Sequence, residues 1–280
     1  MYEKELFDET LDINSTNNYD ISIQVSLNGF SFSLLDTLLN RFVMLREYRL
    51  SGKEAEISEE IREIINKDEF LEKPYRRYHI IFSFERNTLV PSGLFDPALK
   101  DDYFRLNHPI KEGYVVSNNK LLNPDSVLLF DLRKDLLDLL IQVFPEASLS
   151  HQIRPLLNSL YLKTNKRSGK YIQINIEDTY FNIFVITGNE LLFFNTFRYR
   201  NTSDILYFTF FTFENLNLGK DETLHLSGQI EKNDELYNGL IKYNSSIRFV
   251  KPEGSYSMSY IFDNIDIHRY TNLFNIVNCV

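Results

Sequence analysis

The feature that most constrains this chain of 280 residues is an internal repeat. When the chain is shifted by 151 residues, Ile21 falls on Ile172, and the register then holds without a gap for about thirty residues. Alternating strands resemble one another by chance, but here the expected order of strands and helix recurs as well. We therefore infer two tandem copies of one unit. The identical pairs are Ile21 and Ile172, Ile23 and Ile174, Phe30 and Phe181, Phe42 and Phe193, Tyr48 and Tyr199, and Arg49 and Arg200.

Each copy is expected to begin with three strands in a meander. Residues 21–26 alternate between apolar and polar, which is the period of a half-buried strand. Asn28-Gly29 follows and predicts a type I′ hairpin turn, because both residues accept a positive φ. A second apolar run covers Phe30–Leu35, and a third strand is expected at Arg41–Tyr48. The second copy predicts strands at Tyr171–Ile176, Phe181–Ile186 and Glu190–Tyr199, with Gly188-Asn189 as a turn.

A helix and a fourth strand are expected after each meander. Ser51, with Glu54 three residues later, matches a capping box, and isoleucines at helical spacing follow. In the second copy Thr202 or Ser203 can cap the corresponding helix. The fourth strands are predicted at Tyr78–Phe84 and Thr223–Ser227.

The first half carries extra chain between its elements. The polar insert Glu85–Asp125 contains four prolines, and a long excursion of this kind is typical of a functional loop or subdomain. The basic run Lys163–Lys170 is more typical of a solvated linker than of a functional patch. Between them we expect a strand at Ser126–Asp131, a helix from Asp131 or Arg133, a short strand near Ala147–Leu149 and a helix from about Ser150 to Leu162.

The element order β-β-β-α-β-α-β-α, present twice, resembles the actin-like ATPase superfamily, whose two lobes are RNase H-like α/β units. More closely, the chain resembles a Bacteroidetes-restricted family of unknown function with an actin-like ATPase fold. That resemblance implies a two-lobed fold with a first lobe at residues 1–165, including the insert 85–125, and a second lobe at 166–280. It rests on Tyr19–Leu35, Lys170–Phe197, Leu224–Gly228 and the ending His268-Arg269-Tyr270 with Leu273-Phe274-Asn275.

The resemblance also implies a nucleotide cleft, with phosphate held by the first hairpin turn of each half. Backbone N–H groups must approach phosphate closely, so these turns need small residues, and a carboxylate positions Mg²⁺ or water. The candidate positions keep only part of this pattern, because Phe30, Tyr180 and Phe181 stand where small residues are expected. Each candidate can equally be an ordinary turn or strand exit. The candidates are Asn28 and Gly29, Asp178 and Thr179, and Ser227 and Gly228.

The composition of the chain makes several classes of function less plausible. The net charge of −9 disfavours a sequence-independent grip on nucleic acid. The acidic N-terminal segment lacks the features of a secretory signal, and no apolar run is long enough for a membrane helix. Cys279 is the single cysteine, which excludes an intrachain disulfide and fits a reducing compartment. We therefore expect a cytoplasmic protein without membrane insertion.

The leading hypothesis is a non-catalytic scaffold or adaptor with a degenerate actin-like ATPase fold, a protein partner and no cofactor. Loss of the turn glycines argues against efficient phosphoryl transfer, which depends on positioning and electrostatics. The alternative is an enzyme, a divergent nucleotide-binding ATPase or small-molecule kinase, and only this alternative requires ATP and Mg²⁺. We expect no metal site, because the five histidines are too dispersed for metal-ligand spacing.

Overall fold

The computed structural model describes residues 2–164 and 169–279. Contacts within the chain divide it into two compact units. Unit 1 runs to Pro155 and takes in Glu253–Ile265 and the segment from Asn272 on, whereas unit 2 comprises Leu156–Pro252 and Asp266–Thr271. The central part of the predicted linker, with the boundary between residues 165 and 166, lies outside the described residues. The predicted division into lobes at that boundary therefore stays a prediction.

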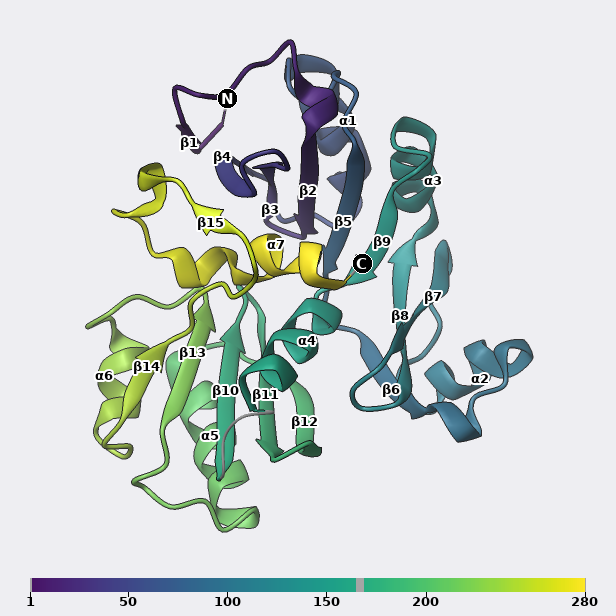
Figure 1. Ribbon diagram of the computed structural model, residues 1–280. Helices are drawn as coiled ribbons and strands as arrows, with labels where there is room; N and C mark the ends of the chain where they lie inside the picture. The colour runs from purple at the N-terminus through teal and green to yellow at the C-terminus, as the bar shows by residue number, and fades with distance from the viewer. Residues whose placement is uncertain (1, 165–168, 280) are drawn as a thin grey trace. The chain divides into compact units, whose positions relative to one another are not determined.

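Unit 1 is built on a mixed seven-stranded sheet with the order β1-β4-β3-β2-β5-β9, in which β15 also pairs with β4 (Figure 1). The predicted meander is present, with β2 antiparallel to β3 and β3 antiparallel to β4, and the fourth strand β5 runs parallel to β2. The strands are β1 (Lys4–Phe7), β2 (Tyr19–Ser26), β3 (Gly29–Asp36), β4 (Arg41–Arg49), β5 (Arg77–Ser83), β9 (Ser148–His151) and β15 (Ser257–Met258).

The central strands of this sheet are buried on both faces, so the prediction of a half-buried first strand is wrong. Ser22 of β2 and Ser33 of β3 are as fully buried as their apolar neighbours. The alternation in the sequence is real, but the sheet is covered by helices and by the C-terminal segment. Helix α1 (Ile57–Lys67) buries Ile57, Ile61 and Ile65, and the ring of Phe274 lies 4.8 Å from that of Phe42.

The insert of unit 1 forms a small subdomain. A three-stranded antiparallel sheet of order β6-β8-β7 packs against helix α2, around the fully buried Phe104. The strand predicted at residues 126–131 is present and is the middle strand of this sheet. The elements are β6 (Asn87–Pro91), η2 (Ser92–Leu94), η3 (Pro97–Leu99), α2 (Lys100–Arg105), β7 (Tyr114–Leu121) and β8 (Ser126–Arg133), followed by α3 (Lys134–Val143).

Unit 2 contains a five-stranded sheet of order β12-β11-β10-β13-β14. As in unit 1, the meander is antiparallel, and the fourth strand runs parallel to the first. Helix α4 (Ile153–Thr164) leads into the unit. The other elements are β10 (Lys170–Ile176), β11 (Tyr180–Thr187), β12 (Glu190–Arg198), α5 (Thr202–Asn215), β13 (Leu224–Gly228), α6 (Glu235–Ile241), β14 (Ile247–Phe249) and η5 (Ile267–Tyr270). Short helical segments complete the chain at η1 (Thr16–Asn18), η4 (Tyr260–Phe262), α7 (Thr271–Asn275) and η6 (Ile276–Cys279).

The predicted helix caps are wrong in both copies. Helix α1 begins only at Ile57 with Glu56 at its N-cap, because residues 54–56 form a turn first. The Ser51 N–H donates instead to the Glu60 carboxylate at 3.0 Å. A cap at Thr202 would require helix α5 to begin at Ser203. The helix instead begins at Thr202, and the Asn201 side chain caps it by accepting from the Asp204 N–H at 3.1 Å.

The outer edge of β4 is covered by segments from both ends of the chain. Strand β1 pairs with residues 44–47 of β4, and β15 pairs with residues 41–42. Between these strands the Asp8 N–H donates to the Val43 carbonyl at 2.8 Å, and the Ser259 N–H donates to the Phe42 carbonyl at 3.1 Å. The edge is thus hydrogen-bonded along most of its length.

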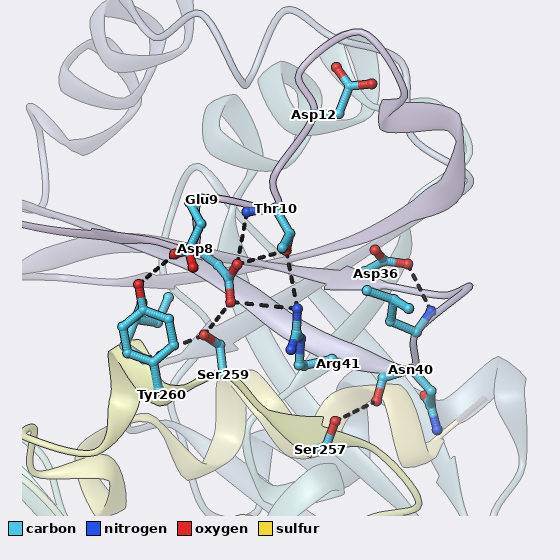
Figure 2. A network of polar contacts seen from close by, with 12 residues as sticks. Asp8, Glu9, Thr10, Asp12, Asp36, Asn40, Arg41, Ser257, Ser259 and Tyr260 are labelled. Atoms are coloured by element: carbon cyan, nitrogen blue, oxygen red, sulfur yellow. Dashed lines mark hydrogen bonds and ion pairs between the residues drawn. The ribbon is translucent and has the colours of Figure 1, made fainter.

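A polar network fastens this cover (Figure 2). The Asp8 carboxylate accepts hydrogen bonds from the Ser259 hydroxyl at 2.5 Å and from the Thr10 hydroxyl at 2.7 Å. An Arg41 Nη atom lies 3.7 Å from the same carboxylate. The Tyr260 hydroxyl donates to Glu9 at 2.5 Å. We call Asp8, Glu9, Thr10, Arg41, Ser259 and Tyr260 the edge clamp of β4.

In the part of the chain that the structure describes, no helix combines the length and the apolar character that a bilayer crossing requires.

Candidate functional site

The first candidate turn joins β2 to β3, as predicted, but it is not a type I′ turn. Neither Asn28 nor Gly29 has a positive φ. The turn is tied to the segment after β4, where the Asn28 carbonyl accepts from the Leu50 N–H at 2.9 Å. In this region it is Gly52 that has a positive φ, of +77°. A Cβ added at Gly52 would lie 2.5 Å from the Asn28 side-chain oxygen. The tertiary contact, not the Asn-Gly pair itself, therefore sets the turn conformation.

Phe30, directly after this turn, is a core residue. Its side chain is fully buried, and its ring centroid lies 6.4 Å from that of Tyr48. A position that would need a small hydroxyl residue for phosphate binding is thus used to build the interior of unit 1.

The second candidate turn joins β10 to β11, with Asp178 and Thr179 exposed at its tip. The Glu177 N–H donates to the Tyr180 carbonyl at 2.9 Å, and the Tyr199 N–H donates to the Thr179 carbonyl at 3.2 Å. The Tyr199 hydroxyl donates to the Glu177 carbonyl at 2.6 Å. Burial, with the negative charges of Asp178 and Glu177, raises the pKa of Tyr199 to about 12. Tyr199 therefore stays protonated and holds the turn.

The third candidate pair, Ser227 and Gly228, ends β13 beside the second turn. In the register of β13 with β10, Ser227 lies opposite Asn175 and Gly228 opposite Ile176. Gly228 has a φ of +83°, and an added Cβ would lie 2.0 Å from the Ile176 carbonyl oxygen. The Gln229 N–H also donates to that carbonyl at 2.7 Å. Gly228 is thus required by a close approach of two main chains.

A buried chain of side-chain hydrogen bonds connects these two places in unit 2. The Gln173 amide donates to the Ser227 hydroxyl at 3.1 Å, and that hydroxyl donates to the Asn175 amide oxygen at 2.8 Å. The Asn175 amide in turn donates to Glu177 Oε1 at 2.8 Å. Gln173, Asn175 and Glu177 are not among the predicted site residues. Their period-two spacing along one strand was the available signal.

The structure therefore brings together four of the six candidate residues, namely Asp178, Thr179, Ser227 and Gly228 in unit 2. Asn28 and Gly29 belong to unit 1. At the second turn the Glu177 carboxylate accepts a hydrogen bond from the buried Asn175 amide. A carboxylate held in this way can orient a cation or a hydrogen-bond donor. Tyr180 and Phe181 beside the turn are buried, and Phe181 packs in the core of unit 2, so both positions are used for packing. Across residues 2–164 and 169–279 no group of three or more His, Cys, Asp or Glu side chains could hold a metal ion.

Solved structures show which fold this is. A Bacteroides thetaiotaomicron protein described as having an actin-like ATPase fold and unknown function is 24% identical, with a TM-score of 0.79 over 93% of this chain and 98% of that one. A chain of the PilM–PilN type IV pilus biogenesis complex is 11% identical, with a TM-score of 0.59 over 93% of this chain and 96% of that one. The chain therefore has the predicted mixed α/β, actin-like ATPase fold.

Sequence comparison places the chain in a family. No curated protein matches it. The family model "Protein of unknown function (DUF3822)" matches residues 8–247, which include most strands of the three sheets and all six candidate-site residues. The predicted restriction to Bacteroidetes stays a prediction. Because this match spans well over half of the chain, the protein belongs to the DUF3822 family.

Proposed function

We propose that this protein is a non-catalytic scaffold or adaptor in the cytoplasm, which keeps an actin-like ATPase fold for the surfaces it presents to a protein partner. The observation that carries the proposal is the use of the phosphate-turn positions for core packing. Phe30 is fully buried and Tyr180 nearly so, each beside the turn that would have to approach phosphate. A protein under selection for phosphoryl transfer would keep small residues at both places.

Two further observations support a binding role. A protein of the same fold occurs in the PilM–PilN complex, so this fold is compatible with protein partnering. In the present chain the insert exposes apolar side chains that its small core leaves outside, and these are candidates for partner contact. They are Leu94, Leu99, Leu106 and Leu122.

The competing function is a divergent nucleotide-binding ATPase or small-molecule kinase. It is favoured by one observation, the buried amide chain that holds Glu177 beside the exposed Asp178. Under this alternative Asp178 and Glu177 would act through Mg²⁺ on bound nucleotide. Under the scaffold proposal they stabilise the turn, and we assign no cofactor.

Nucleotide binding separates the two functions. With the purified full chain, millimolar Mg-ATP should leave the melting temperature unchanged, because only a ligand of the native state raises it. Hydrolysis should not exceed that of an Asp178→Ala variant, with Asp101→Ala as a matched change of an exposed acid. A thermal shift, or hydrolysis lost in Asp178→Ala and kept in Asp101→Ala, would overturn the scaffold proposal.

The partner surface has its own test. A variant with aspartate at the four exposed insert leucines should fold normally but recover fewer partner proteins from a lysate of the source organism. Leu38→Asp, a comparably exposed leucine in the β3–β4 turn, is the control. Equal recovery by both variants would place the partner surface elsewhere.

A further inference from the structure

Helix α5 of unit 2 exposes aromatic side chains in the middle of its outer side. Ile205, Thr209 and Phe213 are buried within the unit. On the outer side Tyr207 is 62% exposed and Phe211 51% exposed, with their rings stacked at 5.9 Å. Exposed aromatic side chains that lie next to each other are typical of an interaction site. The outer face of α5 therefore has the composition of an interface.

Next to this outer face, aromatic rings fill the space between α5 and β12. The Phe208 ring of α5 stacks on the Phe197 ring of β12 at 4.7 Å, and Phe197 stacks on Phe193 at 6.5 Å. All three rings pack against the core of unit 2 and stay partly exposed. We call Phe193 and Phe197 with Tyr207, Phe208 and Phe211 the α5–β12 surface. It joins a helix face to a strand at the margin of the sheet.

That margin is an open strand edge. Among the described residues no strand pairs with the outer side of β12. A bulge disturbs the beginning of the strand, but Phe193–Arg198 keep a regular register with β11. Residues 190–198 contain neither proline nor lysine, which commonly block association at such edges. Main-chain groups of β12 are thus placed to pair with another strand.

The charges of β12 favour one kind of partner. Glu190 at its first position and Arg198 at its last are both exposed. When two such strands pair antiparallel about a two-fold axis, the first residue of each lies near the last residue of the other. Both ends then join opposite charges, which is an arrangement that strengthens an interface.

We propose that the α5–β12 surface binds the same surface of a second copy of this chain. The two β12 strands pair antiparallel, the sheets become continuous, and the aromatic faces of the two α5 helices meet on one side. Apolar area supplies the stability, and the strand pairing with its end charges supplies the register. This association is independent of the proposed adaptor role.

The mass of the full chain in solution tests the proposal. Sedimentation equilibrium over a wide range of concentrations should give twice the mass of one chain. Phe211→Asp should raise the dimer dissociation constant at least about tenfold, because an aspartate pair in an apolar interface repels. Leu38→Asp, an exposed leucine of unit 1, should leave the constant unchanged. Circular dichroism checks that each variant folds.

Charge reversal identifies the partner strand. Glu190→Arg and Arg198→Glu should each weaken the dimer, and the double variant should restore it, since every end contact is again between opposite charges. Only a partner with the same strand predicts this restoration. A monomer at all concentrations, a dimer unaffected by Phe211→Asp, or a double variant weaker than both single variants would overturn the proposal.

Discussion

The third strand of each meander lies at the same place in its sheet, but the two strands have different outer edges. In unit 1 the edge of β4 is covered by β1 and β15 and fastened by the edge clamp (Figure 2). In unit 2 the outer edge of β12 has no paired strand among the described residues. The strand pairing matches Phe197 of β12, opposite Phe181, with Tyr48 of β4, opposite Phe30, so the register predicted from the sequence is two residues off in the third strand.

Arg46 of β4 and Phe197 of β12 show how differently the two edges are stabilised. Arg46 contacts Glu5 of β1, and one of its Nη atoms lies 2.9 Å from Asp68, whose side chain is fully buried. Phe197 instead belongs to the aromatic stack of the α5–β12 surface. One strand order thus accommodates a closed polar edge and an open aromatic edge. An edge strand without such cover is a place for association.

The largest expected effect is the loss of Arg46. Arg46→Ala should lower the free energy of unfolding by about 3–5 kcal/mol, because it leaves the buried Asp68 carboxylate without its ion partner. Phe197→Ala should cost about half as much, since its ring is only partly buried. Urea denaturation of both variants checks the order. Equal losses would mean that the two edges are stabilised to the same degree.

The edge clamp should contribute somewhat less than Arg46 to the free energy of unfolding. Asp8 is only 2% exposed, so Asp8→Ala leaves the Ser259 hydroxyl without its acceptor and Arg41 without its ion partner, at a cost of about 2 kcal/mol. Asp12→Ala changes an exposed carboxylate on the same segment and should change stability less. The same urea experiment measures both. A smaller loss for Asp8→Ala than for Asp12→Ala would show that the clamp does not hold the edge of β4.

Acid should weaken the clamp. Burial alone would raise the pKa of Asp8, but hydrogen bonds from Ser259 and Thr10 and the charge of Arg41 outweigh burial and lower this pKa below its ordinary value of 3.8. The stability from Asp8 is therefore present above the ordinary value and is lost as the pH falls through the lowered one. The stability difference between wild type and Asp8→Ala should shrink over that range. A difference independent of pH would contradict this prediction.

The smallest expected effect concerns the main chain of the two edges. Amide hydrogen exchange in β4 should be slow at every protein concentration, because its outer edge is already paired. Exchange in β12 should slow as concentration rises if the edge pairs with a second copy. Phe211→Asp should remove this dependence. Equal concentration dependence in both strands would contradict the comparison.

Much of the fold could be predicted from residue patterning, because strands and helices are local. The meanders, the helices after them and the strand predicted at 126–131 are all present, although the first helix begins only at Ile57. The predictions that failed depended on contacts distant in sequence. Asn28-Gly29 is a favourable type I′ pair, yet the hydrogen bond from Leu50 imposes another turn. Ser51 matches a cap, yet its N–H binds Glu60.

The candidate site shows the same limit. Glycine at position 228 could be found in the sequence, but its reason, the close approach of the Ile176 carbonyl, follows only from the pairing of β13 with β10. The chain from Gln173 to Glu177 was visible as polar residues with period two. Which residue on the neighbouring strand completes it depends on the register, which places Ser227 beside Asn175.

Residue patterning predicted the repeat, the strands of each copy and the aromatic residues beside the candidate turns. These follow from hydrophobic period and side-chain size, which act over a few residues. Which strand edge is covered depends on contacts between segments that are distant in the sequence. Asp8 and Ser259, which meet on β4, are 251 residues apart. No local preference specifies that contact, because it forms only after the sheet between them has been built.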